Sequence, residues 1–248
     1  MAELRTETMT VNMGPQHPST HGVLRLVLQL DGETVVSVQP TIGYLHTGIE
    51  KTAEEKKYQQ VIPLVERMDY LSSHSNSLGF ALSVEKLLGL EMPRRVQDIR
   101  VLLAELQRLN SHLVWLGTHG MELGAVSIML YTFRERELLL DVNELIAGFR
   151  MFPSYIRVGG LREDLPPGFH ESVARILDLL PGKIEEYEDL LTHNEIFRKR
   201  TRGVGVISGA SALSYGLVGP IARGAGVPYD VRKAFPYCGY ETYQFDVP

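Results

Sequence analysis

Residues 14–22, GPQHPSTHG, hold two histidines at a spacing that would matter on a helix. His17 and His21 are four residues apart, and on a helix such a pair shares one face and can ligate a metal ion. Pro15 and Pro18 flank and separate the pair, however, and proline inside a helix removes a hydrogen-bond donor and clashes with the preceding turn. The sequence therefore predicts a rigid loop that presents a histidine.

Two further stretches carry polar side chains of the kinds that transfer protons. Tyr70 lies in ERMDYLSSHS, and His119 and Glu122 lie together in THGMELGA. A histidine or a tyrosine can give a proton or a hydrogen bond to an oxygen atom, and a carboxylate can orient the histidine. The residue types alone leave two interpretations open, because a lone histidine or tyrosine is also an ordinary packing residue.

Several other kinds of site find no support in the sequence. It contains no G-x-x-x-x-G-K-[ST] phosphate loop, no H-E-x-x-H zinc helix and no G-x-S-x-G nucleophile elbow. The single cysteine, Cys238, cannot form a disulfide within the chain or a metal site made only of cysteines. A hydrolase using His119 and Glu122 has little support, because no nucleophile or ligand set accompanies them. A net charge of −5 argues against a nucleic-acid-binding surface.

The sequence shows no membrane-spanning or secretion segment. No apolar run approaches the about 18 residues that a membrane span needs. The N-terminal MAELRTETMT lacks the apolar core of a signal peptide. We therefore expect a soluble protein, or one that reaches a membrane only through partners.

The N-terminal part, residues 7–46, is predicted to form a β-sheet. Leu24, Leu26, Leu28 and Leu30 fall on one face of a strand, and Arg25 and Gln29 mark the other face. Asp31-Gly32 followed by ETVVSV then predicts a hairpin. The charged run EKTAEEKK at 50–57 is typical of a solvated helix face.

The middle of the chain shows helical spacing of its apolar residues. Long helices are predicted at about 64–89, 94–118 and 121–149, and shorter ones at 168–180 and 183–200, with Gly89 and Gly148 as C-terminal caps. Arg134, Glu135, Arg136 and Glu137 suggest local ion pairs on an exposed stripe, with a buried or interfacial network as the alternative. Long helices with short connections pack as antiparallel neighbours.

These patterns together predict an α+β fold in three parts. An N-terminal β-sheet region covers residues 1–48, a helix-bundle core covers 49–200, and an irregular segment with short strands such as GVGVI covers 201–248.

Seven motifs then occur in order: GPQHPSTHGVLRL, GYLHTGIEK, RMDYL, VEKLLG, FRERE, YIRVGG and YDVRKAFPY. This series resembles the D-type, quinone-site subunit of respiratory NADH:quinone oxidoreductase (complex I). The resemblance runs from about residue 5 to the last residue. It implies a fold like that of the large subunit of nickel–iron hydrogenases, from which the family descends.

The resemblance also implies a function and its residues. In the family, the residues matching His21 and Tyr70 approach the quinone head group, and an acidic residue at the position of Glu122 partners the histidine. Electrons come from an iron–sulfur cluster of a neighbouring subunit and NADH binds to another subunit, so this chain would hold no metal or cluster. ERMDYLSSHS has no cysteine where a hydrogenase carries its first cysteine pair, which removes the thiolates that nickel and iron need.

The partners that the resemblance implies are other complex I subunits. Those expected beside this chain are the iron–sulfur subunit next to the quinone pocket, a neighbour of the C type and the membrane-arm subunit at the quinone entrance. Quinone reduction in the complex is coupled to proton translocation. The chain would be a peripheral subunit on the cytoplasmic face of the bacterial cell membrane, attached through these partners.

Three departures from the family pattern bear on this function. Glu122 stands where the family commonly has an aspartate, which lengthens the arm of the acid by one methylene. Phe152 in RMFPSYIR stands where a histidine is common, and a phenylalanine cannot titrate. The sequence ends at FDVP, where relatives continue, so a truncated, non-catalytic scaffold or assembly form is kept as the alternative function.

Overall fold

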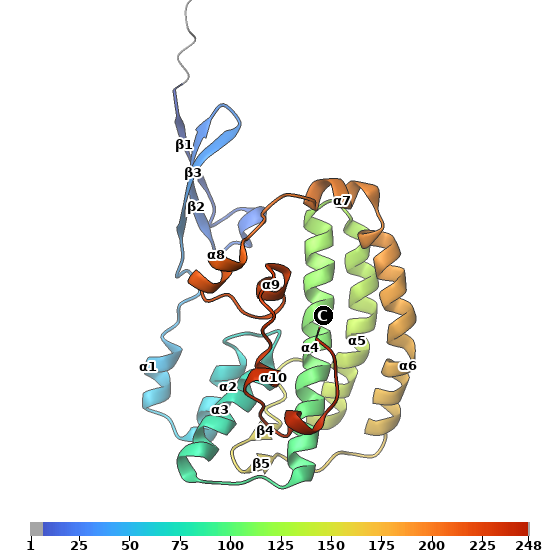
Figure 1. Ribbon diagram of the computed structural model, residues 1–248. Coiled ribbons are helices and arrows are strands. Elements are labelled where there is room, and N and C mark those ends of the chain that lie inside the picture. Colours follow the sequence, from blue (N-terminus) through green and yellow to red (C-terminus); the bar gives the residue numbers. More distant parts are fainter. Residues whose placement is uncertain (1–6, 248) are drawn as a thin grey trace, which may run out of the picture. The chain divides into compact units, whose positions relative to one another are not determined.

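The computed structural model describes residues 7–247, and the chain divides into two compact units (Figure 1). The first unit ends at Glu55 and the second begins at Lys56. Residues 1–6 and 248, which belong to the first and last predicted regions, lie outside the described residues. The sheet followed by long helices confirms the predicted α+β class.

The first unit is built on a three-stranded antiparallel sheet with β2 in the centre. Leu26, Leu28 and Leu30 alternate along β2, and Leu28 is buried. β2 and β3 form the predicted hairpin, whose two-residue loop begins at Gly32 with a φ of 60°. Such a positive φ suits glycine and is what the tight hairpin turns require. The elements of this unit are β1 (Met9–Met13), a 3₁₀ turn η1 (Pro18–Thr20), β2 (Arg25–Asp31), β3 (Thr34–Thr41) and the exposed charged helix α1 (Ile49–Glu54).

The second unit is mostly helical. Its main helices are α2 (Tyr58–Glu66), α3 (Ser73–Leu88), α4 (Arg94–Glu122), α5 (Val126–Ala147) and α6 (Phe169–Tyr187). A two-residue β4 (Ile156–Arg157) pairs antiparallel with β5 (Gly160–Leu161) between α5 and α6. The remaining elements are a π turn η2 (Glu188–Thr192), α7 (Glu195–Thr201), α8 (Gly209–Ser214), α9 (Gly219–Gly224), α10 (Val231–Ala234) and a 3₁₀ turn η3 (Tyr240–Thr242).

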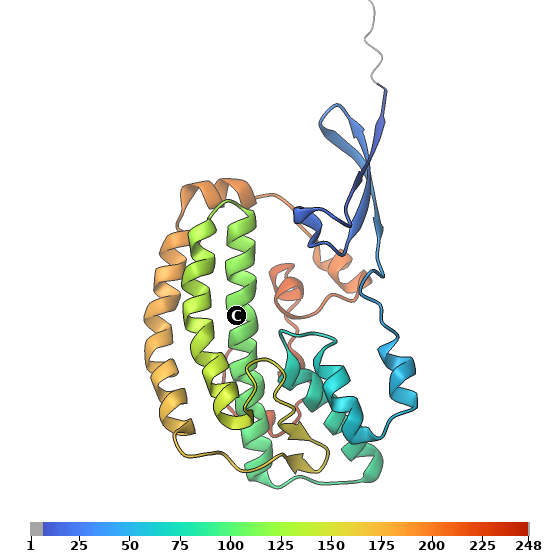
Figure 2. The same ribbon diagram turned by 180° about the vertical axis from the view of Figure 1, so that it is seen from behind.

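The core of the second unit lies where α4, α5 and α6 run side by side (Figures 1 and 2). The predicted helical stripe on α4 is confirmed, because Ile99, Leu103, Leu106 and Leu113 are all buried. Gly117 allows α4 to approach α5 closely, since a Cβ there would lie 2.4 Å from Thr132 Oγ1 and 3.2 Å from Met129 Cα. Buried side chains from all three helices fill this core, among them Leu139, Val142 and Ile146 from α5 and Phe169, Ile176 and Leu180 from α6.

Several predicted helix limits are wrong, two of them for identifiable reasons. α4 continues to Glu122 and α5 begins at Val126, whereas the sequence predicted a break between 118 and 121. The helix expected over 64–89 is two helices, α2 and α3, separated by the turn at residues 67–72. The Asp69 carboxylate accepts the Leu71 N–H at 3.0 Å, and this local bond competes with helix formation. The break expected between 180 and 183 does not occur, because α6 continues through Pro181 with Ile176, Leu180 and Tyr187 buried on its inner face.

The strand expected at GVGVI is also wrong. Residues 203–205 form a turn and a bend and residues 206 and 207 are irregular, since Gly203 and Gly205 have φ values of 74° and 65°. Those conformations lie in the left-handed region, which is incompatible with an extended strand. Short helices, α8 to α10, follow in this segment instead.

The ion pairs of α5 are less local than the exposed-stripe interpretation predicts. Glu135 is buried, accepts a hydrogen bond from the Tyr187 hydroxyl of α6, and also pairs with Arg134 Nε at 2.6 Å. Arg134 Nη2 reaches Glu186 of α6 at 3.4 Å. For Glu135 the structure therefore supports the alternative, an interfacial network between α5 and α6.

Candidate functional site

The loop that carries His21 is short, proline-framed and internally bonded, as predicted. Thr20 is buried, and its hydroxyl bridges the carbonyl oxygens of Pro15 at 3.1 Å and His17 at 3.0 Å. His17 caps the 3₁₀ turn, because its Nδ1 accepts the Ser19 N–H at 3.1 Å. The side chain of His17 thus has a local structural role, and His21 is the histidine that the loop presents.

His21 has an unusual backbone conformation. Its φ of 53° and ψ of 18° are left-handed, and its N–H donates to the Pro18 carbonyl at 3.3 Å. Non-glycine residues adopt this conformation rarely, and such residues collect at functional sites. Gly14 packs closely against the end of the loop, since a Cβ there would lie 2.0 Å from the Leu24 carbonyl oxygen.

Tyr70 lies in the turn between α2 and α3, outside any helix. Its side chain is 58% exposed. The neighbouring residues on both sides are tied down, because Asn76 Nδ2 donates to the Asp69 carbonyl at 3.2 Å and Gln107 Nε2 donates to the Leu71 carbonyl at 2.6 Å. The second unit therefore displays a phenol on a backbone that is fixed on either side of it.

Glu122 is the last residue of α4 and is exposed. The C-terminal end of a helix carries partial negative charge, which repels a carboxylate there. His119, one turn earlier, stacks on Trp115 with ring centroids 5.5 Å apart and meets the edge of Phe197 at 6.2 Å. His119 is therefore a packing residue, which agrees with the weak support for a hydrolase.

The three predicted site residues belong to different parts of the chain. His21 lies in the first unit, and Tyr70 and Glu122 lie on separate elements of the second unit. Two shallow hollows of the second unit, lined mainly by α6 residues and by the start of α4, contain neither Tyr70 nor Glu122.

Comparison with known proteins identifies the family. Residues 122–248 match the family described as the 49 Kd subunit of respiratory-chain NADH dehydrogenase. The chain belongs to this family. The resemblance read from the seven motifs is thereby confirmed.

Individual 49 Kd family members are similar over nearly all of the chain. A D-type subunit of the NADH-quinone oxidoreductase of Chloroflexus aurantiacus is 61% identical over 244 residues, which cover 98% of this chain and 59% of the relative. The corresponding D-type protein of a Roseiflexus species is 59% identical over 98% of this chain and 58% of the relative. That of Geotalea uraniireducens is 55% identical over 98% of this chain and 62% of the relative. The chain thus spans about three fifths of the length of these relatives.

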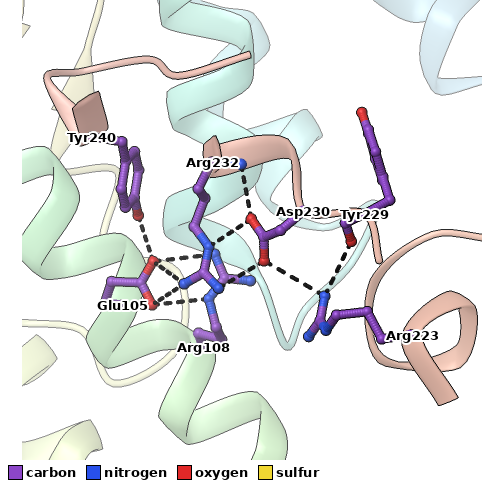
Figure 3. A network of polar contacts seen from close by, with 7 residues as sticks. All are labelled: Glu105, Arg108, Arg223, Tyr229, Asp230, Arg232 and Tyr240. Carbon is purple, nitrogen blue, oxygen red and sulfur yellow. Dashed lines mark hydrogen bonds and ion pairs between the residues drawn. The ribbon is translucent and has the colours of Figure 1, made fainter. Parts of the chain in front are cut away.

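The second unit contains a polar network that the sequence did not reveal (Figure 3). Glu105 of α4 accepts hydrogen bonds from Arg108 Nε at 2.9 Å, from Arg232 Nη1 at 3.1 Å and from the Tyr240 hydroxyl. Asp230 accepts a hydrogen bond from Arg232 Nη2 at 2.8 Å. Its hydrogen bonds from Arg232 lower the pKa of Asp230 to about 2. In the sequence, only the motif YDVRKAFPY pointed to this part of the network. Its partner Glu105 is 127 residues away from Arg232, too far for a local pattern to connect them.

Three further observations concern the described residues. Between residues 7 and 247, no group of three or more histidine, cysteine, aspartate or glutamate side chains is placed to hold a metal ion. Cys238 is buried, and burial raises the pKa of its thiol, which keeps it protonated at neutral pH. In the same part of the chain, no helix has both the length and the apolar character needed to cross a bilayer.

Proposed function

We propose that this chain forms the quinone head-group pocket of a respiratory NADH:quinone oxidoreductase. In the pocket, Tyr70 and His21 donate hydrogen bonds or protons to the two quinone oxygens, and Glu122 orients His21. The observation that carries the proposal is the identity of 61% to a protein named as a D-type subunit of NADH-quinone oxidoreductase. The left-handed backbone at His21 and the fixed turn at Tyr70 support it, because both place a proton-bearing side chain on a rigid support.

The chemistry of these groups suits the reaction. Reduction of a quinone to a quinol adds two electrons and two protons, and negative charge develops on both carbonyl oxygens before they are protonated. Donors that are already aimed at those oxygens stabilise the charge without reorganisation. A phenol and an imidazole can each hold a proton near neutral pH or regain one, which allows a new cycle.

The remaining components lie on partners in this proposal. Electrons arrive from an iron–sulfur cluster of a neighbouring subunit, and NADH binds to another subunit. A neighbour of the C type and a membrane-arm subunit at the quinone entrance complete the surroundings. The chain is then a peripheral subunit at the cytoplasmic face of the cell membrane, and quinone reduction is coupled to proton translocation by the membrane arm.

The test is Tyr70→Phe in the assembled complex. Removal of one donor that acts on developing charge lowers kcat for quinone reduction by about 100-fold. The measurement is quinone reductase turnover with a short-tail and a long-tail quinone. Tyr58→Phe is the matched control, because Tyr58 is 55% exposed, in the same unit, and outside the proposed pocket.

Two results would contradict the proposal. Parental turnover of Tyr70→Phe with both quinones removes Tyr70 from the mechanism. Assembly of a complex that contains the chain but neither binds a quinone analogue nor reduces quinone supports the non-catalytic scaffold instead.

A further inference from the structure

A buried acid stands immediately before the turn that carries Tyr70. Glu66, the last residue of α2, is fully buried, with 0% of its surface exposed. Its Oε1 accepts the Ser154 N–H at 2.7 Å and the Ser77 hydroxyl at 3.0 Å, and its Oε2 accepts the Ser154 hydroxyl at 2.8 Å. Burial raises the pKa of Glu66, and these hydrogen bonds oppose that rise. Three neutral donors therefore converge on one carboxylate.

Ser154 donates two hydrogen bonds to this carboxylate. It lies between α5 and β4 with a φ of 44°, a left-handed conformation that a non-glycine residue keeps only where its surroundings impose it. Its backbone amide and its hydroxyl donate to the two oxygens of the same side chain. The guanidinium of the next residue in the turn, Arg67, lies 4.5 Å from the ring centre of Phe152. The connection between α5 and β4 thus contacts both Glu66, which ends α2, and Arg67, which begins the turn.

The other end of the turn is held by α4. Gln107 is buried, its Nε2 donates to the Leu71 carbonyl at 2.6 Å, and its Oε1 accepts the Ser73 hydroxyl at 3.3 Å. One amide group therefore joins the residue that follows Tyr70 to the first residue of α3. Tyr70 lies between these two anchors, with its side chain largely exposed.

Stability alone does not account for Glu66. Burial of a carboxylate carries a large desolvation penalty, and replacing buried charged groups with apolar residues of similar volume is often neutral or stabilising. A surface turn between two helices also needs no buried anchors to connect them. Rigidity of the turn is the property that this arrangement supplies, and a reacting side chain requires it, because a displacement of about 1 Å can cost about 100-fold in rate.

We propose that Glu66 and Gln107 are positioning residues for Tyr70, which fix the two ends of the turn at residues 67–72 so that the phenol is held in one place. The inference rests on the proposed function for the role of Tyr70. The clamping of the turn itself is independent of that function.

The test compares four variants in the assembled complex. Glu66→Leu and Gln107→Leu remove the anchors. Glu66→Gln keeps the shape of the side chain and one acceptor oxygen. In that variant the Ser154 hydroxyl rotates and accepts a hydrogen bond from the new amide NH₂. Tyr155→Phe is the matched control, because it removes one buried hydrogen bond, to the Glu163 carbonyl at 2.8 Å, near the same connection. The readouts are hydrogen–deuterium exchange of the amides at residues 67–72 and the separate kcat and KM for quinone.

Loss of an anchor is expected to speed exchange in the turn by about tenfold, because one buried hydrogen bond contributes about that factor to local opening. Both leucine variants are also expected to raise KM and lower kcat, whereas Glu66→Gln restores parental exchange and kinetics. Reduced assembly alone would lower the amount of active complex and leave KM unchanged.

The outcomes separate this inference from the proposed function. Parental exchange at 67–72 in both leucine variants, or the same change in Tyr155→Phe, overturns the inference. A loosened turn with parental kinetics shows that the turn is clamped but overturns the positioning role of Glu66 and Gln107, whereas the proposed function of Tyr70 is decided separately by Tyr70→Phe. Should Glu66→Leu not assemble, Ser154→Ala removes a single donor, and about threefold faster exchange in the turn upholds the clamp while parental exchange overturns it.

Discussion

Among single residues, His74, which follows the Tyr70 turn in the sequence, is the histidine whose pKa is most strongly perturbed. Its Nε2 lies 3.0 Å from Asn143 Oδ1, and Asn143 Nδ2 donates to the Arg150 carbonyl at 3.0 Å, which fixes the orientation of the amide. The neutral ring therefore carries its proton on Nε2. Nδ1 is buried and has no hydrogen-bond partner among the described residues, so a second proton there would be unpaired. Burial lowers the pKa of His74 to about 4.

This pKa makes the stability of the chain depend on pH in a defined direction. Between pH 6.5 and pH 4 the unfolded state binds a proton at His74 and the folded state does not, so the free energy of unfolding falls as the pH is lowered. The loss amounts to about 3 kcal/mol; it is absent above pH 6.5 and complete below pH 4. Urea unfolding of the parent and of His74→Met at several pH values measures it, and the variant should lose this part of the slope. Equal slopes in the two proteins would contradict the assignment.

At the candidate site, the sequence indicated candidate residues but not the contacts that hold their backbone in place. GPQHPSTHG and RMDYL pointed to His21 and Tyr70, and the proline-framed loop around His21 is confirmed. The anchors of the Tyr70 turn could not be predicted, because Ser154 is 88 residues from Glu66 and Gln107 is 36 residues from Leu71. Local patterns carry no information about pairs so far apart. The joint role of His21, Tyr70 and Glu122 stays a prediction.

At the scale of elements, local signals were reliable where a single residue decides the backbone. Gly89 and Gly148 end α3 and α5 in left-handed conformations, as glycine caps should. Prediction was wrong where tertiary packing overrides a local signal, as at Pro181, or where a polar side chain interrupts an apolar pattern, as at Asp69. The sequence therefore defined the helices of the bundle better than the turns between them.

Among the ion pairs of the described residues, the most deeply buried one joins Glu85 on α3 to Arg100 on α4. Arg100 is 0% exposed and donates to both Glu85 oxygens, at 2.6 and 2.8 Å, and to the carbonyls of Arg157 and Gly160 at 2.9 and 3.0 Å. The Gly159 N–H donates to Glu85 at 2.8 Å. The pair thus joins two helices to the β4–β5 hairpin.

Removal of one partner should therefore be far more harmful than removal of both. Arg100→Met leaves an unpaired buried carboxylate and is expected to lower the free energy of unfolding by about 3–5 kcal/mol. The double variant Glu85→Leu/Arg100→Met should lose clearly less than the sum of the two single variants. A double-mutant cycle from urea unfolding measures the coupling, and additive losses would show that the ion pair does not act as a unit.

At the scale of the whole molecule, the segment at residues 230–245 packs back onto α4. Glu105 on α4 accepts hydrogen bonds from Arg232 of α10 and Tyr240 of η3 (Figure 3). Arg94 Nη2, also on α4, donates to Thr242 Oγ1 at 2.8 Å. Burial alone would raise the pKa of Glu105, but hydrogen bonds from Arg108 and Tyr240 outweigh it and hold that pKa below its usual value. The network is therefore present at neutral pH and weakens as acid protonates Glu105.

This network predicts that one carboxylate holds the C-terminal segment on α4. Glu105→Gln should accelerate tryptic cleavage after Arg232 and Lys233 by about tenfold, since charge-assisted hydrogen bonds each contribute about 1.5–3 kcal/mol. Glu241→Gln is the matched control, because it removes the same charge from an exposed position of that segment. Equal cleavage rates in the two variants would instead show that the packing of Tyr237, Tyr240 and Phe245 holds the segment.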